Sequence, residues 1–207
     1  VPEQLKDFRN FLYIVWKELN LPDPTPIQYE IASFMQSGDR RAIIQGFRGV
    51  GKSWICSAFV VHQLLLDPRK NILVVSASKT RADDFSTFTL RIIHELDILE
   101  HLRPKANQRF SKISFDVGLA PASHAPSVKS LGVTSQLTGS RADIIVADDV
   151  EVPNNSATQT MRDKLGEQIK EFDAILKPND DSKILVLGTP QCEDTIYYKL
   201  SERGYKT

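Results

Sequence analysis

One eight-residue segment constrains what this chain can fold into more than any other: Gly46-Phe47-Arg48-Gly49-Val50-Gly51-Lys52-Ser53. It matches the pattern G-x-x-x-x-G-K-[ST] at every defined position. The glycines let the backbone curl so that successive N–H groups surround a phosphate. In such a loop the lysine reaches the β- and γ-phosphates and the hydroxyl residue binds Mg²⁺. The segment therefore predicts nucleotide binding, provided that a strand precedes it and a helix follows it.

The flanking sequence meets that condition. Residues 42–45 form a short apolar run, and residues 53–66 carry apolar side chains at helical spacing. The helix after the loop adds the positive end of its dipole to the phosphate site. This context disfavours the alternative, a glycine-rich turn with a solvated lysine.

Composition limits the remaining classes. The chain has 207 residues, which suits one large domain or a domain with an appendage, and 41% of them are hydrophobic. Lys and Arg number 26 and so do Asp and Glu, which argues against a surface that is basic throughout. No apolar run approaches membrane-spanning length, so we expect no membrane partner. Cys56 and Cys192 lack metal-ligand spacing and are expected to be free thiols of a reducing compartment.

Strand and helix patterns alternate along the chain. The buried strands are expected at 42–45, 71–76, 143–148 and 182–187, with weaker candidates at 113–115 and 128–133. The helices are expected at 3–20, 27–36, 53–66, 80–99, 160–176 and 193–202. Alternation of this kind predicts a three-layer α/β/α sandwich with a mainly parallel central sheet.

A second chemical signal lies at the end of the strand 143–148. In nucleotide hydrolases with such a strand, the first acid holds Mg²⁺ and a neighbouring acid polarises the attacking water. Asp148 is the expected Mg²⁺ residue, and either Asp149 or Glu151 is the expected water-activating residue. The alternative is a solvated acidic turn. Paired carboxylates favour an ATPase of the additional-strand type, and the chain has no guanine-reading N/T-K-x-D segment.

Two further polar residues complete the predicted site, one ahead of the phosphate loop and one after the last predicted strand. Gln28, in Thr25-Pro26-Ile27-Gln28, can donate to and accept from an adenine edge, as an upstream glutamine does in helicases and DNA translocases. The alternative is a chance glutamine in the first turn of a helix. Thr189, in Leu187-Gly188-Thr189-Pro190, is expected near the γ-phosphate, where a small hydroxyl residue reports hydrolysis to moving parts. This second motif is weak by itself.

The basic residues divide into two groups. Arg48 lies inside the phosphate loop and Arg141 precedes Asp148 by seven residues, and either could stabilise charge on the transferring phosphoryl group. The alternative for Arg141 is an ion pair with Asp143 or another acid. Loop residues that could contact a DNA backbone, or simply be solvated, are Lys79, Arg81 and Lys129.

As a set, these motifs resemble the large terminase subunit of tailed bacteriophages. The motif sequences are most similar to those of the short-tailed coliphages, in which the subunit is also called DNA maturase B. The resemblance covers about residues 21–207 and includes the arginine inside the phosphate loop. It implies a P-loop ATPase domain of the additional-strand, RecA/helicase-like type at 25–207. An N-terminal helix and linker at 1–24 would pack on that domain. The nuclease domain of the family would lie beyond this chain.

The same resemblance implies a motor that binds ATP and Mg²⁺ and pumps double-stranded DNA into a preformed capsid. Its expected partners are the portal ring of the procapsid, the small terminase subunit and further copies of itself in a ring, expected to be pentameric. It would act in the host cell cytoplasm, transiently on the procapsid. By resemblance, Lys52, Ser53 and Asp148 bind the magnesium nucleotide, Asp149 or Glu151 activates water, and Thr189 couples hydrolysis to motion. Arg48, acting in cis, and Arg141, acting in trans, are the alternative candidates for the arginine finger.

Two other functions remain open at this level. The chain could be the first lobe of a two-lobed DNA helicase, in which case a second RecA-like lobe would follow in the longer sequence. It could also be a scaffold that binds ATP without turnover, in which case replacement of Lys52 would change assembly but remove no hydrolysis.

Overall fold

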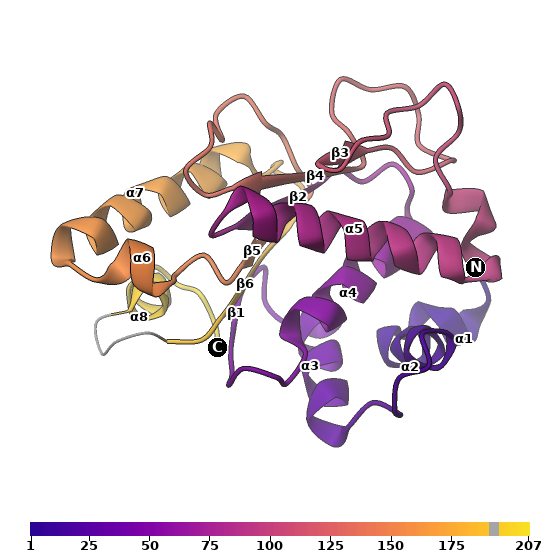
Figure 1. Cartoon of the computed structure of the whole chain (residues 1–207), viewed down its shortest axis with the longest axis horizontal. Coiled ribbons are helices and arrows are strands. Elements are labelled where there is room, and N and C mark those ends of the chain that lie inside the picture. The colour runs from indigo at the N-terminus through magenta and orange to yellow at the C-terminus, as the bar shows by residue number, and fades with distance from the viewer. Residues whose placement is uncertain (191–194) are drawn as a thin grey trace.

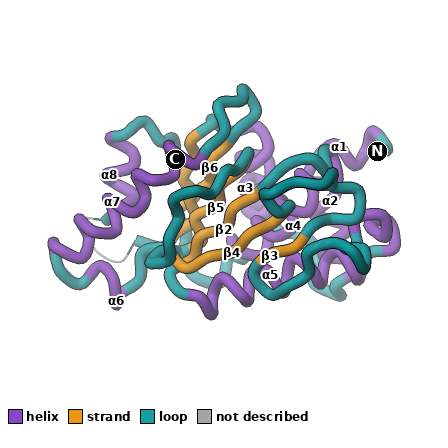
Figure 2. The backbone as a smooth tube through the Cα atoms, turned by 90° about the horizontal axis from the view of Figure 1, so that it is seen from above, coloured by secondary structure: helices purple, strands orange, loops and turns teal. Residues whose placement is uncertain are grey.

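A six-stranded sheet forms the centre of the protein in a computed structural model that describes residues 1–190 and 195–207. The strands are β1 (Arg41–Gln45), β2 (Ile72–Ser76), β3 (Ser114–Phe115), β4 (Val128–Gly132), β5 (Ile144–Asp148) and β6 (Lys183–Gly188). Their spatial order is β1-β6-β5-β2-β4-β3, of which Figure 2 labels the run from β6 to β3. All neighbours are parallel except β3 and β4. The mainly parallel sheet is as predicted.

The position of β6 identifies the type of sheet. It lies between β1, which leads into the phosphate loop, and β5, which ends at Asp148. An extra strand at this place separates the additional-strand ATPases from the nucleotide-binding folds in which these two strands are neighbours. This confirms the predicted fold class.

Helices cover both faces of the sheet (Figures 1 and 2). One face carries α2 (Phe8–Glu18), α3 (Pro26–Ser37), α4 (Lys52–Leu66), α5 (Lys79–Glu95) and the 3-10 helix η1 (Asp97–Leu102). The other carries α7 (Gln159–Ile175) and α8 (Ile196–Glu202). Two short helices, α1 (Glu3–Lys6) and α6 (Pro153–Ser156), complete the described elements. The three layers match the sequence prediction.

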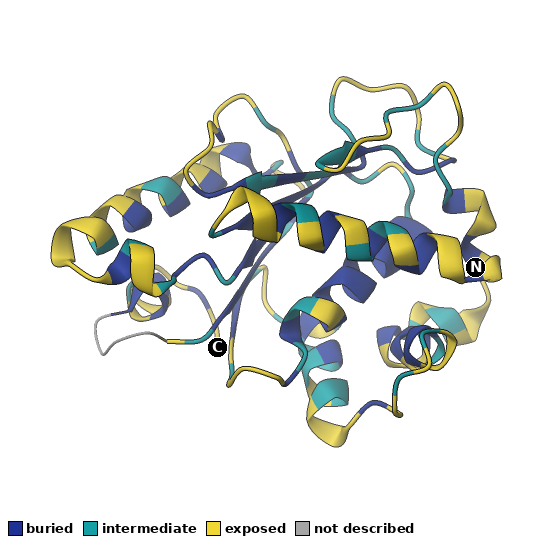
Figure 3. Ribbon diagram, in the orientation of Figure 1, coloured by how far each residue is buried: buried dark blue, intermediate teal, exposed yellow. Residues whose placement is uncertain are grey.

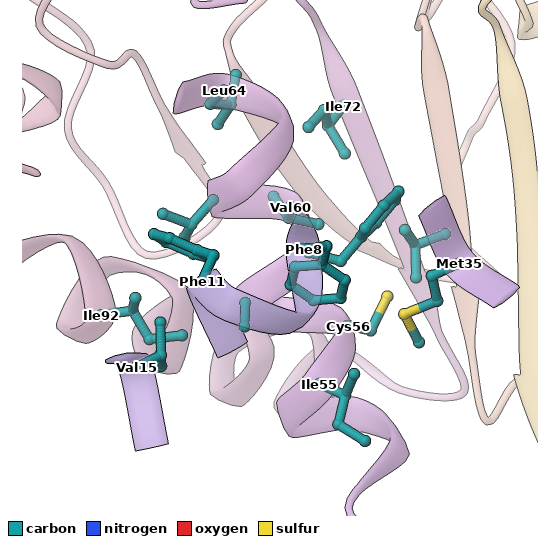
Figure 4. Close-up of a cluster of buried hydrophobic side chains, with 14 of the residues drawn as sticks. Phe8, Phe11, Val15, Met35, Ile55, Cys56, Val60, Leu64, Ile72 and Ile92 are labelled. Carbon is teal, nitrogen blue, oxygen red and sulfur yellow. The ribbon is translucent and has the colours of Figure 1, made fainter. Parts of the chain in front are cut away.

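The hydrophobic core has two parts because the sheet is apolar on both faces (Figure 3). The larger part is built around α4, in which most residues from Ile55 to Leu65 are buried. A helix that is apolar all round belongs in the middle of a fold, and here α2, α3 and α5 enclose it. Figure 4 shows Phe8, Phe11 and Val15 of α2 within this cluster. The N-terminal helices thus share the core of the nucleotide-binding fold.

Several element boundaries differ from the predictions. The expected helix 3–20 is two helices, because Asp7 is extended (φ −80°, ψ 117°) and its side chain accepts a hydrogen bond from the N–H of Arg9 at the start of α2. The expected helix 80–99 ends at Glu95, where extended Leu96 leads into η1. The short helix α6 was not expected. The predicted start of the last helix at Glu193, and Cys192, lie outside the described residues.

Cys56 is a buried free thiol, as expected. Among the described residues, no helix is long and apolar enough to cross a bilayer.

Candidate nucleotide-binding site

The predicted site residues meet where the parallel strands end. The phosphate loop follows β1, Thr189 follows β6, and Asp148 ends β5 with Asp149 directly after it. Since these strands are neighbours and parallel, their carboxyl ends lie at one edge of the sheet, which is where ligands bind in open α/β folds. A cavity of about 650 Å³ opens at this edge and is lined by residues of all three segments.

The phosphate loop has the backbone that its glycines permit. Gly49 and Gly51 both have φ of 88°, in the left-handed region, and Gly51 is the N-cap of α4. The loop is anchored to the neighbouring strand because the N–H of Gly46 donates to the carbonyl of Gly188 over 3.1 Å. α4 begins at the cavity without a side-chain cap, so its first N–H groups are available to an anion.

Lys52 lies folded over its own loop. Its Nζ donates to the carbonyl oxygens of Gly46 at 2.8 Å and Phe47 at 3.1 Å, and lies 3.5 Å from Thr189 Oγ1. The Thr189 hydroxyl itself donates to the Gly46 carbonyl over 3.0 Å. Burial lowers the pKa of Lys52, and the carboxylates of Asp149 and Asp148 oppose that shift. The ammonium and the Thr189 hydroxyl thus lie together beside the loop carbonyls, at the bottom of the cavity.

Ser53 and Asp148 form a pair of oxygen donors. The Ser53 hydroxyl donates to Asp148 Oδ1 over 2.7 Å. Burial raises the pKa of Asp148 to about 6, while the Ser53 hydrogen bond lowers it; Asp149 raises it further, and Arg81 and Lys52 oppose the rise. Mg²⁺ is held by few protein oxygens and completes its octahedron with waters and phosphate oxygens. This pair therefore fits Mg²⁺, although no group of three or more His, Cys, Asp or Glu side chains suited to a metal lies within the described residues.

The two candidates for water activation occupy different surroundings. Asp149 lines the cavity and has a left-handed backbone (φ 49°), held by a 2.9 Å hydrogen bond from its N–H to the Leu187 carbonyl. Glu151 is only 1% exposed, and its Oε1 accepts a 2.9 Å hydrogen bond from the N–H of Ile196 at the start of α8. Of these two residues, only Asp149 lines the cavity.

Gln28 lies on the cavity wall but its amide is partly engaged. Its Oε1 accepts from the N–H of Thr25 at 3.1 Å in a capping box, and its Nε2 donates to the Val50 carbonyl at 3.0 Å. One amide hydrogen and one lone pair remain for a ligand. The glutamine thus ties α3 to the phosphate loop as well as lining the cavity.

The two candidate arginines lie at opposite edges of the sheet. Arg48 lines the cavity, and among the described residues its exposed side chain makes no hydrogen bond or ion pair. Arg141 is exposed and precedes β5, so the length of the strand separates it from Asp148. The alternative pairing of Arg141 with Asp143 is wrong. Asp143 instead pairs with Lys177 at 3.1 Å and accepts from Asn71 and Asn179.

Sequence reasoning missed part of the cavity wall. Trp16, Asp23 and Trp54 line it, as does Arg81, for which the sequence suggested DNA contact or solvation. The signal for Arg81 was its position in the first turn of a helix directly after a buried strand. The other two DNA candidates, Lys79 and Lys129, do not line this cavity.

Comparison with known sequences gives the family. Residues 43–192 match the family model described as terminase large subunit, T4likevirus-type, N-terminal. The chain belongs to the terminase large-subunit family. Over its whole length it is 55% identical to the terminase large subunit of Enterobacteria phage T3, of which it spans 36%. This confirms the resemblance to the terminases of short-tailed phages.

Solved structures give the same fold at low sequence identity. The HK97 bacteriophage large terminase matches with a TM-score of 0.65 at 12% identity, over 97% of this chain and 41% of that one. The ATPase domain of the large terminase of Thermus phage P74-26 matches with a TM-score of 0.54 at 15% identity, over 88% and 71%. S. cerevisiae Dbp5 bound to RNA and ADP BeF3 matches with a TM-score of 0.59 at 13% identity, over 93% and 47%. The terminase fold is therefore shared with a lobe of that protein.

Proposed function

We propose that this terminase domain hydrolyses ATP and uses the energy to move double-stranded DNA into a preformed capsid. One observation carries the hydrolytic part: Lys52, Ser53, Asp149 and Thr189 line one cavity at the ends of adjacent parallel strands, and Ser53 donates a hydrogen bond to Asp148. Each is a group that phosphoryl transfer uses. The family supports the packaging part.

The residues of the phosphate loop would bind the nucleotide. On binding, the Lys52 ammonium would leave the carbonyls of Gly46 and Phe47 and donate to β- and γ-phosphate oxygens. Ser53 and Asp148 would hold Mg²⁺, which would supply positive charge against the negative charge that develops on the phosphate in the transition state. Gln28 would present its remaining amide hydrogen and lone pair to the adenine edge.

Asp149 is our choice for the residue that orients and deprotonates the attacking water. Its carboxylate borders the cavity beside the proposed Mg²⁺ residue, whereas the Glu151 carboxylate is buried and accepts a backbone hydrogen bond from α8. Glu151 would then be a positioning residue that fixes the turn after β5 to α8. Thr189, bonded to Gly46 and near Lys52, would transmit the loss of the γ-phosphate to β6.

The two arginines would stabilise the transferring phosphoryl group from different subunits. Arg48 can reach the cavity of its own chain, and Arg141, at the far edge of the sheet, can serve only a neighbour's site. This arrangement requires a ring, for which we propose five subunits on the portal of the procapsid, in the host cytoplasm. Double-stranded DNA, the small terminase subunit and a nuclease domain in the longer protein complete the proposal.

Steady-state ATP hydrolysis tests the proposal, measured with this chain over a wide range of protein concentrations and with Lys52→Ala beside it. We expect turnover per subunit to rise with concentration and to fall by at least about 100-fold in Lys52→Ala, because a lost phosphate ligand and an incomplete ring both remove transition-state contacts. ATP binding without turnover at any concentration, alone or with portal and DNA, would overturn hydrolysis and favour the non-hydrolysing scaffold. Strand separation of duplex DNA by the longer protein would favour the helicase, which shares the Dbp5-like fold.

A further inference from the structure

Arg81 occupies a position between two cavities. It lines the 650 Å³ nucleotide cavity and also a second cavity of about 230 Å³, and Ser53 and Trp54 likewise line both. Asp148 and Asp149 border the second cavity as well. Arg81 is therefore a basic residue next to both acids of the proposed hydrolytic site, whereas the sequence suggested only DNA contact or solvation for it.

The sheet fixes Arg81 at this place. β2 pairs directly with β5, and its last residue, Ser76, lies opposite Asp148 in the register. α5 begins three residues later, so its first turn lies beside the end of β5. The connection has little freedom, since a side chain at Gly132 would come within 3.1 Å of the Lys79 backbone nitrogen. Four adjacent strands thus bring one contribution each to the same edge: the phosphate loop, Thr189, the acids and Arg81.

The guanidinium of Arg81 has no fixed partner. Among the described residues it makes no hydrogen bond and no ion pair, and the residue is exposed to the cavities. Its positive charge nevertheless acts on Asp148, where it partly offsets the rise in pKa that burial causes. A magnesium triphosphate remains strongly negative, and the planar guanidinium binds phosphate oxygens in a bidentate manner. A cation poised without a partner beside the place of the terminal phosphate fits that group.

We propose that Arg81 donates to the terminal phosphate of the bound nucleoside triphosphate in its own subunit and so distinguishes ATP from ADP. The inference rests on the proposed nucleotide site and assigns to it a contact that reaches in from α5. Arg48 approaches from the phosphate loop, whereas Arg81 approaches from the side of the acids. Loss of the γ-phosphate would free α5, and the β2 and β4 ends that pack on it, from the nucleotide.

Nucleotide titrations with magnesium test this assignment, using fluorescent ADP and a fluorescent non-hydrolysable ATP analogue on wild type, Arg81→Ala, Arg81→Lys and Lys79→Ala. Lys79 is the matched control, because it is an exposed cation two residues away that lines neither cavity. We expect Arg81→Ala to weaken binding of the ATP analogue by about 10-fold or more and that of ADP by less than about twofold. Arg81→Lys should recover part of the loss, and Lys79→Ala should match wild type.

Other results would overturn the assignment. Equal weakening of both nucleotides in Arg81→Ala would mean that Arg81 only balances the charge of the acids. Unchanged nucleotide binding with weaker, less salt-dependent DNA binding would place Arg81 on DNA. A wild-type protein that binds neither nucleotide would reject the proposed function and this contact with it. Thermal melting of each variant separates loss of fold from loss of contact, and Arg81→Lys provides the reading if Arg81→Ala does not fold.

Discussion

Asp149 has a backbone conformation that residues other than glycine and asparagine or aspartate seldom adopt. With φ of 49° and its N–H bonded to Leu187, it turns the chain sharply at the end of β5. The turn separates two nearby acids: Asp149 stays at the cavity, and Glu151 enters the interior and binds the first N–H of α8. Backbone strain of this kind is common at active sites, where it fixes the direction of a functional side chain.

This division predicts different outcomes for the two acids. Asp149→Asn should lower kcat about 100-fold or more with ATP binding retained, because the amide cannot take the proton of the attacking water. Glu151→Gln should keep kcat within a few fold, since the amide oxygen can still accept from Ile196. Glu151→Ala should lower the free energy of unfolding by about 1–3 kcal/mol, because a buried N–H loses its acceptor. Single-turnover hydrolysis and chemical unfolding measure these effects, and the reverse ranking of kcat would assign water activation to Glu151.

Two glycines facing α8 allow a matched comparison at the residue scale. A side chain at Gly188 would overlap the ring and hydroxyl of Tyr197, which is fully buried. At Gly166 in α7, a methyl group would meet only Ile196 at 3.5 Å and Arg203 at 3.7 Å, which is ordinary contact.

Gly188→Ala should therefore destabilise the fold by about 1–3 kcal/mol and shift Thr189 away from Gly46, with loss of turnover. Gly166→Ala should instead stabilise it by up to about 1 kcal/mol, because alanine favours a helix interior. Urea unfolding and ATP hydrolysis of both variants check the pair. Equal stability changes in Gly188→Ala and Gly166→Ala would mean that Tyr197 does not limit the space beside Gly188.

At the scale of elements, local patterns carried most of the prediction. Apolar runs located every parallel strand to within a residue or two, since strands buried on both faces leave a plain signal. The break at Asp7 was missed because the helical spacing of apolar residues continues across it, and only the cap of α2 marks it. The order of strands is not written in any local pattern, so Arg81 could not be placed beside Asp148 until β2 and β5 were known to pair.

His62 joins the N-terminal helices to the central helix α4. It is fully buried, its Nε2 lies 2.7 Å from the carbonyl of Leu5, and its ring lies 5.3 Å from those of Phe8 and Phe11. Burial lowers the pKa of His62. The native state therefore binds this proton less readily than the unfolded chain does, so stability is lost as pH falls below the unfolded value of about 6.5.

His62→Phe should reduce this pH dependence. One pH unit below 6.5, the expected loss for wild type from this residue is at most about 1.4 kcal/mol, and the variant should lack it. The raised pKa of Asp148 has the opposite effect on stability, which it increases as the pH falls. Both proteins share this effect, so it cancels in the difference between them. Thermal melts of wild type, His62→Phe and the exposed-histidine control His101→Asn between pH 7.5 and 5.5 measure it. Parallel curves for wild type and His62→Phe would show that His62 is not the titrating group.

At the scale of the whole molecule, the proposed site residues lie at the carboxyl ends of the parallel strands, and Arg141 lies at their amino ends. The carboxyl ends of β1, β6, β5 and β2 supply the nucleotide cavity, whereas Arg141 lies before β5. β5 alone, with five residues at about 3.3 Å each, is roughly 16 Å long, and Arg141 precedes its first residue. A side chain cannot turn back over that length. If Arg141 acts in hydrolysis, it must act on the cavity of another subunit, so the domain has an incomplete site when alone.

A mixing experiment tests that incompleteness. Arg141→Ala retains every residue of its own cavity, and Lys52→Ala retains the arginine, so each alone should hydrolyse ATP at least about 100-fold more slowly than wild type. Mixed at concentrations where wild-type turnover per subunit is high, they should recover part of that activity, because some interfaces then join an intact cavity to an intact Arg141. The recovery should vanish on dilution, and Lys129→Ala, a cation that does not line the nucleotide cavity, should behave as wild type throughout. Wild-type turnover by Arg141→Ala, with no gain on mixing, would exclude an arginine in trans at this position and leave Arg48 and Arg81 as the arginines of a self-contained site.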